Sequence, residues 1–441
     1  MKETSKGLKK EISFFTALTI VMGTVIGSGV FFKPEAVYLA TETAGLGLAA
    51  WVLGGFITIC GGLTTAELSA AIPETGGMVV YLRRAYGPLI SYLLGWAQTV
   101  IYFPANIAAL SIIFATQAIN LMGLEQHFII PIAIAAAMII ILTNLMGTQT
   151  AGRLQSVATV AKMVPLFVII VFGLLHQGDV QFQLLPDSMA PTSTISKLGT
   201  GLVATLFAYD GWINVGAIAG EMKDPKKDLP KAIVAGLTAV MGIYVLINLA
   251  YLQVMPAAAL GATPTPAAEV AHLLFGNSGG KLVTIGILVS VFGTINGYAM
   301  TGIRVPYAMA LNNELPFSNW LKKLNRQQVP ANSALTLLLI AIVMIFTGQY
   351  NQLTDLLVFV IWIFYTLVFI AVFIMRRKEP ELVRPYKVPF YPVIPLIAIV
   401  GGCFIVVNTL LTQPTNTALG IFLTAIGLPI YFYKRKTGTV E

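Results

Sequence analysis

Charge is what this sequence has least of. Only 10% of its 441 residues are Asp, Glu, Lys or Arg, whereas 56% are hydrophobic, and the mean hydropathy is +0.81. A soluble globular protein would be about a quarter charged. The scarcity of charge therefore excludes a soluble protein and indicates a chain that lies mostly within a bilayer.

Cysteine and histidine are also scarce. Cys60 and Cys403 are the only cysteines, and both lie in apolar runs, so we expect them to pack as small apolar side chains rather than form a disulfide framework. The histidines, His127, His176 and His272, fall in or beside predicted outer loops without metal-ligand spacing. No nucleophile stands at a recognisable spacing from a base. We therefore predict no metal, no cofactor and no enzymatic activity.

Long apolar runs fill most of the chain. A helix needs about 20 apolar residues to cross a bilayer. Twelve runs approach or exceed that length, and we predict a transmembrane helix in each: Ile12–Phe32, Gly47–Ile72, Pro88–Leu121, Phe128–Met146, Val157–Leu175, Leu198–Ala219, Ala232–Val254, Leu282–Ile303, Val329–Thr347, Leu356–Met375, Phe390–Leu411 and Ala418–Tyr433.

The basic residues predict how these helices are oriented. With the N-terminus inside, all of the 27 Lys and Arg residues lie in cytoplasmic segments except Lys33, Lys197 and Lys281, which fall outside, and Lys162, which lies within a span. Cytoplasmic loops of membrane proteins carry such an excess. We therefore expect both termini in the cytoplasm, and the net charge of +8 follows from topology rather than from nucleic-acid binding.

The predicted connections leave no room for an extramembrane domain. The longest, at residues 177–197 and 312–328, are too short for a core of their own. We predict a single membrane domain over residues 1–441. The basic, proline-spaced loop "RRKEPELVRPYKVP" (Arg376–Pro389) separates the first ten spans from the last two.

The first span contains the stretch "VMGTVIGSGVFFKP" (Val21–Pro34), with three glycines at its centre. Gly23-x-x-x-Gly27 fits a small-residue packing face between helices. Alternatively, Gly27, Ser28 and Gly29 mark a break in the helix. A break frees amide N–H groups at the positive end of one half-helix, which suits a carboxylate, and frees carbonyls that can accept from an ammonium group.

The sixth span contains a second candidate break. In "TLFAYDGWINVGAIAGE" (Thr205–Glu221), the segment Tyr209–Trp212 interrupts an apolar helix near its middle. Asp210 there could also be a loop residue at a misplaced boundary. Transporters built from inverted repeats pair their broken helices in this way. Two matched breaks favour a transporter with a site for a zwitterion.

Several segments resemble a known family. "GTVIGSGVFFKP", "AELSAAIPETGGMVVYLRRAYGP", "FAYDGWINVG" and "GEMKDPKKDLPKAI" are similar to the L-amino-acid transporter family of the amino acid–polyamine–organocation superfamily, and most similar to its bacterial alanine–serine–cysteine exchangers. The resemblance covers essentially the whole chain. It implies an all-α membrane protein of leucine-transporter type: five-plus-five inverted repeats (residues 12–175 and 197–375) and two peripheral helices (389–435).

The resemblance also implies a substrate site. The carboxylate would bind the backbone N–H groups of Ser28, Gly29 and Val30, and the ammonium would meet carbonyls at Val25 or Ile26 and near Phe207. Phe207 would be an outer gate, and Tyr244 matches a tyrosine implicated in substrate coordination, although it could be an ordinary packing aromatic. The full predicted binding set is Val25, Ile26, Gly27, Ser28, Gly29, Val30, Phe207, Ala208, Gly211 and Tyr244, with Lys162, Phe207, Asp210 and Trp212 in gating or coupling.

Lys162 lies about 18 Å from the cytoplasmic start of its helix, near the middle of a hydrocarbon core about 30 Å thick. A charge at that depth is by default functional and faces the bundle interior, although it could also be neutral and merely tolerated. The resemblance places such a lysine where a sodium ion binds in sodium-coupled relatives of the fold. We expect its ammonium group to meet carbonyls around Gly23–Ile26, together with Ser290.

The leading functional hypothesis is therefore sodium-independent exchange of small neutral L-amino acids (alanine, serine, glycine, threonine and cysteine) across the cell membrane by alternating access. The alternative is a proton-coupled or cationic amino acid uptake system, in which Asp210 carries a proton or pairs with the substrate. A sensor or channel is a third class. For neutral substrates, we expect the Asp210 carboxylate to point away from the pocket and cap the following half-helix.

Two further expectations concern charged groups and partners. Glu67 and Glu74 lie near Arg83 and Arg84 in the sequence, which predicts interfacial ion pairs or a role in an inner gate. Animal members of the resembled family carry a cysteine in the loop after the third helix. Here that loop reads "MGLEQHF" (Met122–Phe128), so no disulfide-linked heavy chain is expected, and the partners are the amino acid and the lipid bilayer.

Overall fold

The structure, a computed structural model, describes residues 13–74, 77–177, 191–215, 222–347 and 349–436, and within those ranges every regular element is a helix. The longer helices are α1 (Phe14–Val25), α2 (Gly29–Thr41), α3 (Ala44–Ala71), α5 (Pro88–Ala97), α6 (Phe103–Met122), α7 (Ile129–Leu145), α8 (Thr148–Leu175), α9 (Pro191–Ala208), α10 (Pro225–Val254), α12 (Pro266–Gly302), α15 (Ala331–Thr347), α16 (Tyr350–Lys378), α17 (Val393–Thr412) and α18 (Pro414–Ala425).

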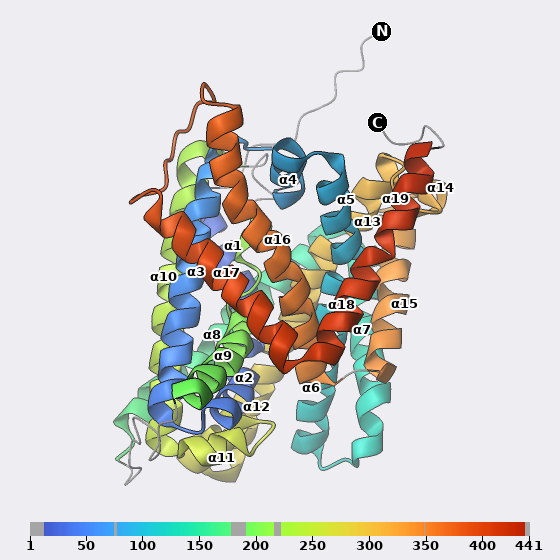
Figure 1. Cartoon of the computed structure of the whole chain (residues 1–441). Helices are drawn as coiled ribbons and strands as arrows, with labels where there is room; N and C mark the ends of the chain where they lie inside the picture. Colours follow the sequence, from blue (N-terminus) through green and yellow to red (C-terminus); the bar gives the residue numbers. More distant parts are fainter. Residues whose placement is uncertain (1–12, 75–76, 178–190, 216–221, 348, 437–441) are drawn as a thin grey trace.

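Shorter elements complete the fold: α4 (Met78–Tyr86), η1 (Gln98–Tyr102), η2 (Gln126–Phe128), α11 (Ala257–Gly261), α13 (Arg304–Leu311), α14 (Ser318–Leu321) and α19 (Gly427–Lys436). The helices form one bundle, with α4 and α14 at one end and α11 at the other (Figure 1). We call these the α4 end and the α11 end.

Nine helices of the described residues are long and apolar enough to cross a membrane, or ten if the bent pair α1 and α2 is one span. The chain is therefore a multi-pass helical membrane protein, as predicted. Two expected spans are not among these ten. The ninth, Val329–Thr347, contains only the shorter apolar helix Ala331–Phe346, and the sixth, Leu198–Ala219, runs into residues 216–221, which lie outside the described residues. The twelve-span arrangement stays a prediction.

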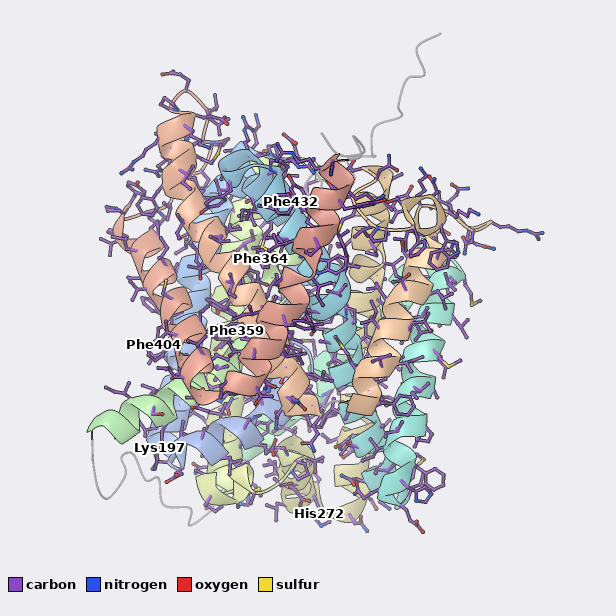
Figure 2. The ribbon with its side chains drawn as sticks, turned by 45° about the vertical axis from the view of Figure 1, so that its right-hand side comes forward. Lys197, His272, Phe359, Phe364, Phe404 and Phe432 are labelled. Carbon is purple, nitrogen blue, oxygen red and sulfur yellow. The ribbon has the colours of Figure 1, made fainter. Side chains whose placement is uncertain are left out.

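The helices pack closely against one another, and the bundle carries apolar side chains on its outside. Glycines on α3 allow close packing: a Cβ at Gly54 would lie 2.4 Å from Thr205 Oγ1, and one at Gly62 would lie 2.6 Å from a methyl group of Leu237. The late helices also expose apolar side chains, among them Phe404 on α17 and Phe432 on α19 (Figure 2). Both features agree with the composition, because a bilayer solvates apolar surface.

The α11 end carries two residues that were predicted to lie in outer segments, Lys197 and His272 (Figure 2). Lys33 was predicted to lie beyond the end of the first span, and that boundary was wrong. The first span continues beyond Phe32 as α2, which runs to Thr41, so Lys33 is fully buried within a helix. A bent span needs more residues to cross the membrane than a straight one. A prediction from hydropathy assumes a straight helix and therefore ends the span too early.

Ion pairs at the α4 end differ from those predicted. Buried Glu67 accepts two hydrogen bonds from Arg376, at 2.8 and 2.6 Å, and lies 3.5 Å from Arg384. Arg83 pairs with Glu314 and Arg84 with Glu379, each over more than 200 residues of sequence. The predicted pairing of Glu67 with its sequence neighbours was wrong, because the end of α16 and the loop after it fold over α3 and α4.

Candidate functional site

The first predicted break is present. The last backbone hydrogen bond of α1 runs from Ile26 N to Met22 O at 2.8 Å, and α2 begins at Gly29 with an axis bent by 42°. Ser28 occupies the N-cap position, but its side chain makes no capping hydrogen bond. Amide groups in the first turn of a helix have no partner within that helix. The α1–α2 break therefore presents amide donors at the start of α2.

The second predicted break is also present. Helix α9 ends at Ala208, and the chain passes through a turn, with Asp210 N 3.2 Å from Phe207 O, into a short 3-10 turn at 212–215. Gly211 has φ +98°, a region that other residues rarely adopt. The sequence "YDGW" thus folds as a turn because its glycine reaches the left-handed region.

The two breaks touch each other. A Cβ at Gly29 would lie 2.5 Å from Ala208 Cα, and a Cβ at Gly211 would lie 3.1 Å from Thr24 O. The Thr24 hydroxyl also lies 3.3 Å from Gly211 O. Only glycine permits these approaches. The start of α2 is therefore held against the end of α9, and the two breaks are in direct contact.

Tyr244 of α10 links the two breaks. Its hydroxyl oxygen is 2.9 Å from Val25 O, at the end of α1, and 2.9 Å from Ala208 O, at the end of α9. The hydroxyl donates one proton, so it serves one carbonyl at a time. Tyr244 therefore binds the carbonyl groups that the breaks free. This contact is more specific than that of a packing aromatic.

Lys162 of α8 meets the same region. Its side chain is buried, and its ammonium group donates to Gly23 O, one of the last carbonyls of α1. The final carbonyls of a helix lack partners within it. The predicted contact with Gly23–Ile26 is therefore present. The Ser290 hydroxyl, expected as a second acceptor, has no hydrogen-bond partner among the described residues.

Phe207 packs against Tyr350 and Lys33 on the α11 side of the breaks, and we call these two residues the cover over Phe207. Its ring stands edge-on to that of Tyr350, with centroids 5.8 Å apart, and Lys33 Nζ lies 5.4 Å from the Phe207 centroid and 5.1 Å from that of Tyr350. Lys33 in turn donates to Thr354 at 2.6 Å, and the Tyr350 hydroxyl lies 3.4 Å from that of Ser28. Side chains of helices α2, α9 and α16 thus contact one another beside the break.

Asp210 and Trp212 face the opposite side of the break. The Asp210 carboxylate lies 2.5 Å from the Tyr102 hydroxyl, 2.7 Å from that of Tyr365 and 3.2 Å from that of Tyr298. Trp212 is buried against Tyr365, with ring centroids 5.8 Å apart. The partners of the carboxylate are therefore tyrosines that the sequence did not predict, rather than the amide groups of a following half-helix that it was expected to cap.

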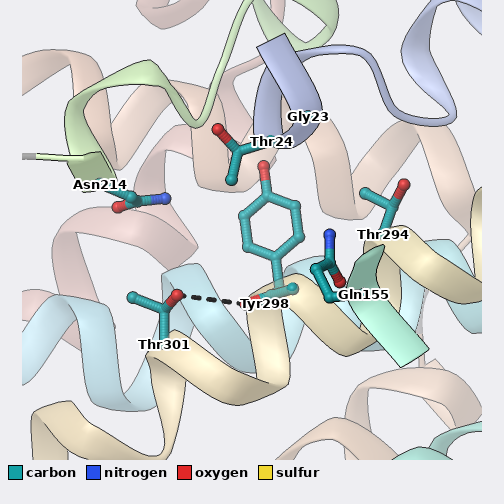
Figure 3. Close-up of a pocket in the computed structure, with 8 residues that line it drawn as sticks. Gly23, Thr24, Gln155, Asn214, Thr294, Tyr298 and Thr301 are labelled. Carbon is teal, nitrogen blue, oxygen red and sulfur yellow. Dashed lines mark hydrogen bonds between the residues drawn. The ribbon is translucent and has the colours of Figure 1, made fainter. Parts of the chain in front are cut away.

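A small cavity adjoins the breaks. It measures about 10 Å³, room for about one water molecule, and is lined by Gly23, Thr24, Asn214, Thr294 and Tyr298 among others (Figure 3). A larger cavity of about 280 Å³ lies apart from the breaks, beside the end of α12 and α13. The cavity beside the breaks is therefore smaller than an amino acid.

Comparison with known proteins decides the family. Residues 12–431 match the amino acid permease family. The chain is 40% identical over 440 residues to the serine/threonine exchanger SteT of Bacillus subtilis (strain 168), covering 99% of each protein. It is 31% identical to the b(0,+)-type amino acid transporter 1 of Mus musculus, covering 98% of this chain and 89% of the relative, and 30% identical to the Asc-type amino acid transporter 1 of Homo sapiens, covering 96% and 82%.

The chain belongs to the amino acid permease family. The resemblance seen in the sequence is confirmed, and this permease is an amino acid transporter rather than an enzyme. Its breaks, which the sequence predicted, lie at the centre of the permease. Residues that the sequence analysis missed surround them: Lys33 and Tyr350 on one side, and the three tyrosines of Asp210 on the other.

Each missed residue left only a weak signal in the sequence. Lys33 follows an apolar run and stands two residues before Glu35, so the sequence signals its burial only once the helix is known to continue past it. Tyr102 ends η1, a π-helical segment in the third span, and such segments often occur at functional sites. No spacing rule connects Tyr102, Tyr298 and Tyr365, because they lie on three helical elements far apart in the chain.

Proposed function

We propose that this permease is a sodium-independent exchanger of small neutral L-amino acids such as alanine, serine, glycine, threonine and cysteine. The observation that carries the proposal is the contact between the two helix breaks, with Lys162 at the carbonyl end of α1. Amide donors at α2 suit the substrate carboxylate, and break carbonyls suit its ammonium group. The name of the exchanger SteT supports this substrate class.

In this proposal the carboxylate binds the N–H groups of Ser28, Gly29 and Val30, near Gly27. The ammonium group binds Ile26 O and the carbonyls around Phe207 and Ala208. Tyr244 already contacts Val25 O and Ala208 O, so its role is to orient these carbonyls beside the substrate. Phe207 is the outer gate. Trp212 and Asp210 border the site on the other side of the break, and Gly211 is the hinge of the turn between them.

Lys162 replaces a bound sodium ion in this mechanism. Its ammonium group supplies a positive charge at Gly23 O, where the helix break concentrates negative carbonyl dipoles. A buried cation of this kind holds the end of α1 without any ion from solution. Exchange is therefore expected to proceed at full rate in the absence of sodium.

We also propose the topology of this exchanger in the membrane. The α4 end carries Arg83, Arg84 and the basic end of α16, Arg376–Lys378 (Figure 1). An excess of positive charge identifies the cytoplasmic side. The α4 end then faces the cytoplasm with both termini, and the cover over Phe207 faces outward. The proposal also includes twelve spans, arranged as five-plus-five inverted repeats with two peripheral helices. We propose transport by alternating access, without a disulfide-linked heavy chain.

Counterflow of labelled alanine into proteoliposomes tests the function. Vesicles preloaded with unlabelled serine, in sodium-free buffer without a pH gradient, are expected to accumulate label, whereas empty vesicles are not. Accumulation into empty vesicles driven by an inward proton gradient, or competition by arginine equal to that by serine, would favour the alternative that buried Asp210 suggests: proton-coupled or cationic amino acid uptake.

A further inference from the structure

Asp210 is a buried acid within the break that follows α9, and three tyrosine hydroxyls contact its carboxylate. Tyr102 and Tyr298 reach Oδ2, at 2.5 and 3.2 Å, and Tyr365 reaches Oδ1, at 2.7 Å. We call Tyr102, Tyr298 and Tyr365 the tyrosine cage.

The cage occupies most of the acceptor positions of the carboxylate. An ionised carboxylate offers about four lone-pair sites, and three hydroxyls take three of them. A hydroxyl next to a carboxylate acts as the donor. In the part of the chain that the structure describes, no lysine or arginine forms an ion pair with Asp210. The acid is therefore satisfied by neutral donors alone.

The cage also adjoins the site. Asp210 follows the proposed gate, Phe207, by three residues, and its neighbour Gly211 contacts Thr24 of α1. The ring of Tyr298 lines the small cavity beside Gly23 and Thr24, with its hydroxyl directed toward Thr24 in Figure 3. The three cage residues come from η1, α12 and α16, so the carboxylate is enclosed from three separate elements.

We propose that the tyrosine cage determines substrate specificity: by occupying the Asp210 carboxylate, it prevents a cationic side chain of an amino acid from pairing with that acid. The proposal rests on the proposed exchange of small neutral amino acids. A buried carboxylate beside a binding site would otherwise attract a cation strongly, because the low dielectric of the interior strengthens such pairs. The cage would give specificity by denying a cationic amino acid the carboxylate partner that its side chain needs.

Removing one hydroxyl is expected to weaken the discrimination against a cationic side chain. A carboxylate that loses a hydrogen bond in a buried site is left with an unmet acceptor, and a ligand that brings a cation can supply the missing partner. Hydrogen bonds to charged groups are worth enough that one such change shifts relative affinity by about 10- to 100-fold.

The experiment compares two competitors of equal chain length against alanine counterflow. 2,4-Diaminobutyrate carries a second ammonium group, whereas homoserine carries a hydroxyl at the same position. The ratio of their inhibition constants is measured for the wild type, Tyr298→Phe, Tyr365→Phe and Tyr102→Phe. Tyr81→Phe is the matched control, because Tyr81 is buried and its hydroxyl has no hydrogen-bond partner among the described residues.

The wild type and Tyr81→Phe are expected to prefer homoserine strongly, and at least one cage variant to lower that preference about tenfold or more. Adding Asp210→Asn to that variant should restore the preference, because the amide no longer attracts a cation. Lysine and arginine, tested in parallel, show how far the pocket accepts longer cations.

Three results would overturn the proposal. The wild type could accept both competitors equally, all cage variants could keep the wild-type preference, or all three could reach the membrane folded yet fail to exchange alanine. The last result would mean that the hydroxyls serve transport itself. Failure of the wild type to exchange alanine at all would instead contradict the proposed function, which keeps the two claims distinguishable.

Discussion

A methyl group added at Gly29 tests the contact between the breaks. The Cβ of Gly29→Ala would lie 2.5 Å from Ala208 Cα and 2.6 Å from Ala208 Cβ. Carbon atoms in contact ordinarily stay about 3.5–4.0 Å apart, so α2 and α9 would have to separate by about 1 Å or more. Because one of the opposing atoms is backbone, no rotation of a side chain can relieve the clash.

The expected loss follows from this separation. Overpacking in a tight interior costs about 1–3 kcal/mol, which corresponds to about 5- to 150-fold in kcat/KM if the strain falls on the substrate-bound state. Gly29→Val should lose more, since its side chain is larger. The clash with Ala208, rather than simple blockage of the carboxylate's approach, is then the physical reason for the loss.

The assay is initial-rate counterflow of labelled alanine, normalised to the amount of folded protein in the vesicles. Gly152→Ala is the matched control, because a Cβ at Gly152 in α8 meets no atom within 4 Å. Ala208→Gly, added to Gly29→Ala, should rescue only partly, since Ala208 Cα remains in place. Wild-type exchange by Gly29→Val would refute the reasoning that the two breaks form one tightly joined site.

Three further outcomes are expected. Lys162→Ala should slow alanine exchange about 10- to 100-fold with the protein still folded, because Gly23 O is left buried and unpaired, and a wild-type rate would end the proposed role of Lys162. Tyr244→Phe should lower kcat/KM about tenfold, since two break carbonyls lose their shared donor, whereas Tyr92→Phe, whose hydroxyl has no partner among the described residues, should not. Glu67→Gln should lower the apparent melting temperature of the detergent-solubilised protein, because Arg376 and Arg384 lose a buried carboxylate; an unchanged melting temperature would contradict this.

The sequence allowed the breaks and Lys162 to be predicted because each violates a simple rule. Three glycines near the middle of an apolar span, and an acid and a glycine together in another, conflict with a regular membrane helix. A lysine deep in a span conflicts with the cost of burying charge. Such local conflicts can be recognised without knowing which helices are neighbours.

The residues that surround the breaks could not be predicted in this way. Tyr102, Tyr298 and Tyr365 look like ordinary packing aromatics until the fold brings them to Asp210 from elements 88 to 155 residues away in sequence. Lys33 looked like a loop residue because the bend between α1 and α2 hides the length of the helix that follows. Partners of Glu67 were misassigned because sequence neighbours were preferred over the end of α16.

The central claim is that the paired breaks, with Lys162 in place of a metal ion, bind a zwitterionic amino acid without sodium. The most direct measurement is wild-type counterflow of labelled alanine in vesicles preloaded with serine, with every sodium salt replaced by choline. The account predicts the same initial rate in choline as in sodium. A rate that falls to the level of empty vesicles without sodium, and recovers as sodium is restored, would contradict it.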